Sequence, residues 1–211
     1  MKLINITSAV LAILLLAGCS ANTKQIESHK LTTDIAGLVP DDSVRPAILF
    51  KRPNAASLST YDSFIVDSVK ISHRDPNNQK INPADLLRMQ NYFQKQVTTQ
   101  LSDAGYKITD QAGPKTMRIT FTLSGISTPS AKANVVSMII PIALKVGEVT
   151  VEAAFTESQS NRVDAVVVSR SQGSRVLNES PWSTWGDLES SFDNWAQGIA
   201  KAVNKSHASA N

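Results

Sequence analysis

The sequence predicts an α+β fold in which an antiparallel sheet of about four to five strands is packed by two amphipathic helices. Three observations support this class. Two segments, 82–105 and 183–205, repeat apolar residues at helical spacing. Other segments alternate apolar and polar residues, as strands with one solvent-exposed face do. The patterns follow one another along the chain in the order β-α-β-β-β-α.

The first strand is predicted at 63–72, "SFIVDSVKIS", where β-branched residues are frequent and turn-forming residues flank the run. Asp67, inside this strand, is expected to be a salt-bridged or edge-protecting carboxylate and not a general base. The preceding stretch, 31–59, is interrupted by three prolines and has no sustained period. It predicts an ordered lead-in without long regular elements.

The first helix follows, with signals at both of its ends. Asn82 suits the N-cap, Pro83 suits the first helical position, and Gly105 suits the stop. A short extra strand near 106–109 would raise the strand count from four to five. The apolar residues of the helix that repeat at helical spacing are Leu86, Met89, Phe93, Val97 and Leu101.

Three more strands are predicted at 117–124, 148–156 and 163–170. Apolar and polar residues alternate along them, which predicts one buried and one solvent-exposed face of an antiparallel sheet. Ser160-Asn161 suits a hairpin between the last two strands, because Asn tolerates the left-handed conformation.

The second helix is predicted to start near Thr184, which stands three residues before Asp187 in a capping-box arrangement. Its apolar residues fall on a single stripe. The folded domain is therefore expected to span 34–205 and to be followed by a disordered tail at 206–211. The stripe consists of Leu188, Phe192, Trp195, Ile199 and Val203.

The N-terminus has the parts of an export signal: Lys2, an apolar stretch at 9–16 too short to span a bilayer, and small residues before Cys19. Leu16-Ala17-Gly18-Cys19 resembles the bacterial lipobox, which implies cleavage before Cys19 and acyl chains on it. Residues 1–18 are then a signal peptide, and 19–33 are the lipidated cysteine with a flexible, polar tether. The alternative is an ordinary secretory signal with an incidental cysteine.

Acyl chains on Cys19 would make the membrane itself a partner of the chain, since two or three chains give stable attachment. Ser20, in place of an Asp after the cysteine, resembles proteins sorted onward in Gram-negative cells. The expected location is therefore the outer membrane, lipid-anchored on its periplasmic face.

The sequence lacks the motifs of nucleophile elbows, P-loops and dinucleotide-binding turns. His29, His73 and His207 have no metal-site spacing, so no metal, cofactor or catalytic residue is predicted. The net charge of +3 comes from scattered Lys and Arg residues without a block of like charge, which argues against nucleic-acid binding. These observations predict a protein that is not an enzyme.

Two apolar features have both a structural and a functional interpretation. The run that contains Ile139 and Ile140 either packs as an irregular strand pair or loop at one end of the sheet, or forms a partly exposed patch for a partner or membrane surface. Trp182 and Trp185 either pack the start of the last helix, or form a platform for glycan or an interface anchor. These four residues are the candidate interaction surface.

Three blocks of the chain, "ILFKRPNAASLSTYDSFIVDSVKI", "GEVTVEAAFTESQSNRVDAVVVSRSQGSR" and "WGDLESSFDNWAQGIAKAV", resemble the DUF3313 family of bacterial lipoproteins. The resemblance implies the fold and the location and adds no mechanism, because that family has no assigned activity. The leading hypothesis is a periplasm-facing binding module with an envelope protein or envelope component as partner. The alternatives are an accessory subunit of an envelope transport assembly and a hydrolase with unidentified carboxylates.

Overall fold

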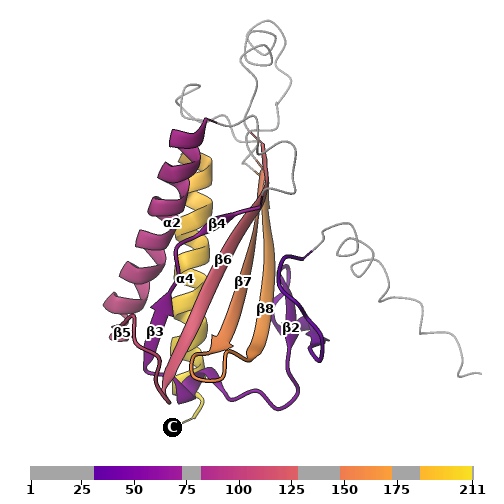
Figure 1. Cartoon of the computed structure of the whole chain (residues 1–211), viewed down its shortest axis with the longest axis vertical. Coiled ribbons are helices and arrows are strands. Elements are labelled where there is room, and N and C mark those ends of the chain that lie inside the picture. Colours follow the sequence, from indigo (N-terminus) through magenta and orange to yellow (C-terminus); the bar gives the residue numbers. More distant parts are fainter. Residues whose placement is uncertain (1–30, 73–81, 128–147, 173–185, 211) are drawn as a thin grey trace, which may run out of the picture. The chain divides into compact units, whose positions relative to one another are not determined.

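The long strands of the computed structural model follow the alternating segments of the sequence. They are β6 (Thr116–Ser127), β7 (Glu148–Glu157) and β8 (Val163–Gln172), and they pair antiparallel in this order (Figure 1). The structure describes residues 31–72, 82–127, 148–172 and 186–210. Residues from Thr32 onward form one compact unit, and Met1–Leu31 belong to a separate one.

Within the described residues the sheet has eight strands and not the predicted four to five. Its order is β1-β2-β8-β7-β6-β3-β5, and β4 also pairs with β6. Two added strands come from the irregular lead-in, and the strand predicted at 63–72 is divided in two. The five short strands are β1 (Val39–Asp41), β2 (Ile48–Lys51), β3 (Ser63–Val66), β4 (Lys70–Ile71) and β5 (Lys107–Ile108).

The sheet is mixed, whereas the sequence predicted an antiparallel one. Strands β3 and β4 pair parallel with β6, and β5 pairs parallel with β3. The reason is the helix between β4 and β5, because a helical crossover returns the chain in its original direction. The short strand predicted near 106–109 is confirmed as β5.

Helix α2 (Pro83–Asp103) begins and ends as its sequence predicts. The Ala84 amide donates to Asn82 Oδ1 over 2.9 Å, and Pro83 takes the first helical position. The chain leaves the helix at Gly105, whose φ of 90° few other residues adopt at low cost. Of the predicted stripe, Leu86 is only partly buried, and the fully buried members are Met89, Phe93, Val97 and Leu101.

Helix α4 (Gly186–Ala208) extends beyond its predicted end at 205. The predicted tail at 206–211 is therefore wrong for its first three residues. Ser206 Oγ bonds Ser57 Oγ over 2.9 Å, and His207 Nε2 lies 3.0 Å from the Tyr61 carbonyl oxygen. These contacts fix the last turn of α4 beside the short 3-10 helix Leu58–Thr60. The predicted cap residue Thr184 lies outside the described residues.

Both helices cover the same face of the sheet, and an aromatic cluster lies at the centre of the core. The Phe93 ring stacks on Phe192 with centroids 5.0 Å apart and meets Phe121 edge-on at 4.8 Å. Trp195 packs against the same cluster while partly buried, and its Nε1 donates to Ser169 Oγ over 2.9 Å. The predicted stripes of α2 and α4 therefore meet each other and the sheet.

The other face of the sheet was predicted to be exposed to solvent, and on β7 this is wrong. Thr150, Glu152 and Thr156 point away from the helices and are nevertheless buried. One reason is that the lead-in crosses this face, because Thr32 and Thr33 bond to Glu152. On β6 the corresponding side chains are half-buried, as at Thr120.

A hydrogen bond between the helices gives a pH-dependent prediction. Tyr92 Oη donates to Asp193 Oδ1 over 2.9 Å, and burial together with this acidic partner raises the pKa of Tyr92 from 10 to about 12. The fold therefore stabilises the neutral phenol. The contribution of the neutral phenol to the free energy of unfolding is complete below about pH 10 and is lost as the pH rises through about 12.

We expect Tyr92→Phe to lower the free energy of unfolding at pH 8 by about 1 to 2 kcal/mol, the value of a partly buried hydrogen bond to a charged group. The difference between wild type and variant should shrink between about pH 10 and 12. Urea denaturation at pH 8, 10 and 11 measures it. A difference that stays constant over this range would show that the phenol proton does not stabilise the fold.

Candidate functional site

The sequence-predicted site residues all lie outside the part of the chain that the structure describes. His29 and His73 lie outside it as well. The described elements nevertheless fix where the segments 128–147 and 173–185 begin and end, and these two segments carry the four candidate surface residues. The predicted residues are the lipidation residue Cys19 and the candidate surface residues Ile139, Ile140, Trp182 and Trp185.

Six ends of described elements meet at one end of the compact unit, which we call the loop end (Figure 1). Strand pairing places Ser127 opposite Glu148 and Glu148 opposite Gln172. The Ser72 amide donates to Leu123 of β6 over 2.7 Å, near the same end. The loop end consists of Ser72, Asn82, Ser127, Glu148, Gln172 and Gly186.

The helices begin at this end too. Arg88 Nη2 lies 2.7 Å from Glu189 Oε1, which sets the first turns of α2 beside the first turns of α4. Ser171 Oγ and Ser191 Oγ are 2.6 Å apart, which joins the last residues of β8 to the start of α4. The three connections 73–81, 128–147 and 173–185 therefore all leave from and return to the loop end. All four candidate surface residues belong to two of these connections.

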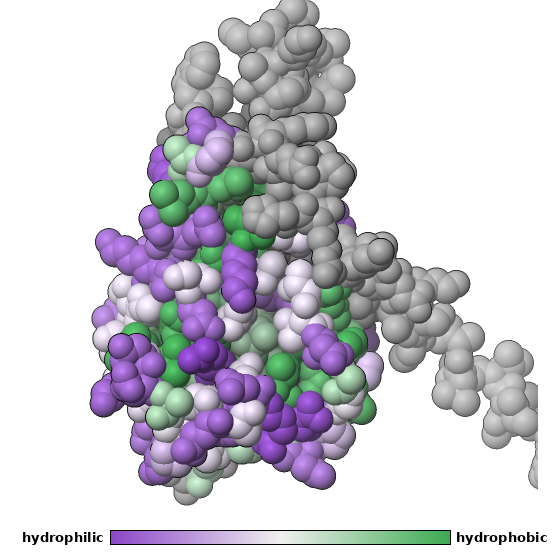
Figure 2. Space-filling view, in the orientation of Figure 1, coloured by the Kyte–Doolittle hydropathy of each residue, from purple (hydrophilic) through white to green (hydrophobic). Residues whose placement is uncertain are grey.

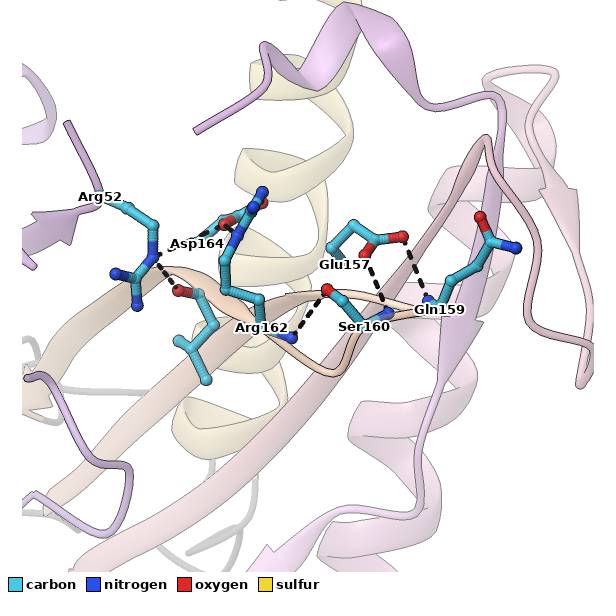
Figure 3. Close-up of polar contacts among 7 residues, drawn as sticks. Arg52, Glu157, Gln159, Ser160, Arg162 and Asp164 are labelled. Carbon is cyan, nitrogen blue, oxygen red and sulfur yellow. Dashed lines mark hydrogen bonds and ion pairs between the residues drawn. The ribbon is translucent and has the colours of Figure 1, made fainter. Parts of the chain in front are cut away.

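The opposite end carries the β7–β8 turn and a charged cluster (Figure 3). The Asp164 side chain is 3% exposed, and Arg162 contacts its two carboxylate oxygens at 2.7 and 3.3 Å. Arg52 Nε lies 3.9 Å from Asp164 Oδ1 and donates to the Val163 carbonyl over 3.0 Å. The buried charge is thus balanced, and the cluster ties β2 to the turn.

The turn itself is held by Glu157, which accepts the amides of Gln159 and Ser160 at 3.1 and 2.9 Å (Figure 3). The hydrogen bonds from Ser160 hold the pKa of Glu157 below its usual value. Asn161 has a φ of 57°, which confirms the left-handed residue predicted in this hairpin. We call residues 158–162 the hairpin end.

Two residues singled out in the sequence have structural partners. Asp67 accepts the Thr120 hydroxyl over 2.8 Å and lies 4.0 Å from Arg118 Nη1. This confirms it as a salt-bridged carboxylate. The His207 ring packs 5.4 Å from the Tyr106 ring in addition to its contact with the Tyr61 carbonyl.

Glu152 was not identified as a site from the sequence. It lies in the central strand β7, is 7% exposed, and receives three hydrogen bonds from two residues of the lead-in. The Thr32 amide donates to Oε2 over 2.8 Å, and the Thr32 hydroxyl and the Thr33 amide each donate to Oε1 over 2.7 Å. A glutamate among the polar positions of a central strand was the only signal in the sequence.

The lead-in residues Thr32–Leu38, which we call the arm, run from Glu152 to strand β1. Apolar residues occupy the same face of the sheet beside Glu152, since Val166 lies opposite both Ala154 and Phe50. All three are buried, as is the next such residue, Val168, but they are not part of the core beneath the helices. They form a second, smaller apolar layer on the arm side of the sheet.

The described surface is mixed in polarity. Figure 2 shows hydrophilic and hydrophobic residues interspersed over the displayed face. Within the described ranges, the exposed large apolar side chains belong to separate elements: Val39 of β1, Val44 of the 3-10 helix Asp42–Val44, Leu87 of α2 and Ile108 of β5. Single exposed apolar residues of this kind are ordinary on protein surfaces.

The described residues contain no group of three or more His, Cys, Asp or Glu side chains placed to hold a metal ion. None of the described helices combines the length and the hydrophobicity needed to cross a bilayer.

The comparison with protein families shows to which family the chain belongs. The model of DUF3313, a family of proteins of unknown function, matches residues 27–199. The chain belongs to the DUF3313 family. The resemblance seen in three blocks of the sequence is thereby confirmed, and the DUF3313 match covers all described strands and most of α4. No curated protein sequence matches the chain.

Several solved structures are similar to this DUF3313 protein at low sequence identity. PelC of Paraburkholderia phytofirmans, solved as a dodecamer, is 9% identical with a TM-score of 0.45, over 74% of this chain and 96% of that one. A DUF330 protein of Xanthomonas campestris is 10% identical with a TM-score of 0.46, over 75% and 94%. A minor lipoprotein of Acinetobacter baumannii is 10% identical with a TM-score of 0.37, over 69% and 95%.

Proposed function

We propose that this DUF3313 protein is a lipid-anchored, non-catalytic binding module of the bacterial cell envelope. The lipobox-like Leu16-Ala17-Gly18-Cys19 supplies the attachment residue, and the polar stretch Ser20–Lys30 supplies a tether. The compact unit begins at Thr32, directly after this stretch. Ser20 after the cysteine favours the outer membrane, with the unit on its periplasmic face.

The observation that carries a binding role is the loop end. The three connections 73–81, 128–147 and 173–185 leave from it, and two of them carry the candidate residues Ile139, Ile140, Trp182 and Trp185. Binding surfaces are commonly built from loops at one end of a rigid scaffold. Tryptophan and isoleucine side chains are suited to anchor a protein partner in such a place. The proposed partner is an envelope protein that meets the loop end.

The contacts of three acidic residues, two of them buried and Asp67 half-buried, support a non-catalytic role. Asp164 is paired with two arginines, and Glu152 is occupied by the arm. Asp67 is bonded to Thr120 and faces Arg118. A general acid or base needs a free carboxyl group that reaches a substrate. These three carboxylates are used to hold the fold.

Photo-crosslinking in living cells tests the binding role. A photoreactive amino acid replaces Leu87, which is 57% exposed and lies in the second turn of α2, or Ile139. The matched control replaces Gln159, which is exposed at the hairpin end. We expect an adduct of defined mass from both test positions, stronger than that from Gln159 by about tenfold, because only the loop end faces the partner.

The adducts are detected by immunoblotting and identified by mass spectrometry. If the captured protein is a component of a transport assembly, the chain is an accessory subunit of that assembly. An adduct that forms only from Gln159 would place the binding surface at the hairpin end and overturn the proposal.

A further inference from the structure

Glu152 is a buried carboxylate of strand β7, and its hydrogen-bond donors come from the arm. Burying a carboxylate is unfavourable unless donors replace the lost water. The Thr32 and Thr33 amides and the Thr32 hydroxyl supply these donors at 2.7 to 2.8 Å. Val168 of β8 lies opposite Glu152 on the same face of the sheet. We call Glu152 and the apolar layer beside it, Phe50, Ala154, Val166 and Val168, the seat of the arm.

The arm lies on the sheet without being part of it. None of its residues is buried, and none of them belongs to a strand, because β1 begins only at Val39. The hydrogen bonds donated by the Ala36 and Leu38 amides stay within the arm. Among the described residues, the hydrogen bonds found between the arm and the sheet all end on Glu152. A segment with so few fixed contacts opens locally while the sheet stays folded.

A glycine marks the junction between the arm and β1. Gly37 has a φ of 76°, and a Cβ at this position would lie 2.9 Å from Arg52 Nη1. The arm therefore turns closely over a guanidinium that Asp164 and the Val163 carbonyl hold in place. Because glycine adopts many backbone conformations, rotation at this residue lifts the arm without breaking the pairing of β1 with β2.

A lifted arm leaves its seat in need of a replacement. Lifting alone is unfavourable, because the Glu152 carboxylate loses its three donors. A segment restores them if it supplies two successive backbone amides and a hydroxyl group. The arm of a second copy has this chemistry by identity, and reciprocal exchange fills both seats with the same contacts. Once the first arm is exchanged, the two copies are joined, so the second exchange is intramolecular.

We propose that the arm is exchanged between two copies of this DUF3313 protein, and that Glu152 receives it from either copy. The inference goes beyond the proposed function, because it requires neither the lipid anchor nor a partner at the loop end. It identifies a second copy of the chain as the partner of the arm side of the sheet.

The exchange is tested with two variants of residues 20–211, each of which lacks one side of the contact. Thr32→Pro removes the amide and hydroxyl donors of residue 32 and leaves the seat intact. Glu152→Gln replaces an acceptor oxygen of the seat with an NH₂ group and leaves the arm intact. In an equimolar mixture, the free arm of one variant meets the empty seat of the other.

Sedimentation velocity measures the association of the two variants. We expect the mixture to form a dimer at a protein concentration about tenfold lower than either variant alone requires, because hydrogen bonds to a charged group contribute at least this factor. A mixture that stays as monomeric as its two components would overturn the inference.

Glu157→Gln is the matched control, because Glu157 also accepts two backbone amides but belongs to the hairpin turn. Its own arm stays in its own seat. Its mixture with Thr32→Pro is therefore expected to need about tenfold more protein to form a dimer than the mixture of Glu152→Gln with Thr32→Pro.

Hydrogen exchange in the wild-type chain tests the lifting of the arm without any variant. We expect the Thr33 amide to exchange about a hundredfold or more faster than the Val151 amide of β7, and at a rate that low concentrations of urea do not change. A Thr33 amide that exchanges only when the whole sheet unfolds would overturn the inference, even if a variant fails to fold.

Discussion

Phe93→Ala is expected to lower the free energy of unfolding by about 3 to 5 kcal/mol, the range for truncating a core aromatic residue. The Phe93 side chain is 0% exposed and touches rings from both sides of the core, Phe121 on the sheet and Phe192 on α4. Its removal leaves a cavity where the two helices and the sheet meet. Urea denaturation followed by circular dichroism measures the loss.

The control for this prediction is Leu87→Ala on the same helix. Leu87 is 57% exposed, so we expect a change within about 0.5 kcal/mol, as for ordinary surface substitutions. If Phe93→Ala costs no more than Leu87→Ala, the contact of α2 with the sheet is not the core of the domain.

Cys19→Ser is expected to abolish membrane anchoring. A serine hydroxyl does not replace the thiol to which the diacylglycerol is joined, so the signal segment 1–18 should remain uncut and the precursor should stay at the inner membrane. Without acyl chains, each contributing about 0.8 kcal/mol per buried CH₂, the unit has no hold on the outer membrane. Gel mobility and membrane fractionation measure both effects.

Ser20→Ala is the neighbouring control, and we expect normal processing and outer-membrane fractionation from it. Normal maturation and fractionation of Cys19→Ser would mean that the N-terminus is an ordinary secretory signal. In that event the cysteine is incidental.

The elements with a strong local pattern could be predicted from the sequence. Helix α2 has a capping residue at Asn82, a glycine at 105 and an apolar stripe, and the structure reproduces both ends and buries the stripe from Met89 to Leu101. The hairpin between β7 and β8 was signalled by Asn161, whose left-handed backbone is a local property. Such features depend on neighbours in the chain, so no knowledge of the tertiary structure was needed.

The missing parts of the sheet depend on contacts between distant residues. Strand β2 has only four residues. Its strand conformation depends on pairing with β8, which lies more than a hundred residues later in the chain. The parallel pairing of β3 with β6 follows from the helix between them and leaves no mark on either strand. Strands this short, which form because they pair with distant strands, have too few residues to show an alternation of apolar and polar side chains.

The same limit applies to the candidate site. The sequence pointed to Cys19 because it ends a lipobox-like motif. It pointed to Ile139 and Trp185 because the first lies in an apolar run and the second lies near another tryptophan at the start of the last helix. It gave little indication of Glu152, because the donors that occupy this carboxylate are 119 and 120 residues away. Only the folded sheet brings the arm and β7 together.

The central claim, that the chain is an envelope protein anchored through Cys19, is tested most directly by mass spectrometry of its mature N-terminus. The protein is extracted from cell membranes and digested with trypsin, which releases the peptide ending at Lys24. The peptide is expected to begin at Cys19 and to carry a diacylglyceryl group on the thiol and an acyl group on the amine. A peptide with an unmodified Cys19, or an N-terminus at another residue, would contradict the claim.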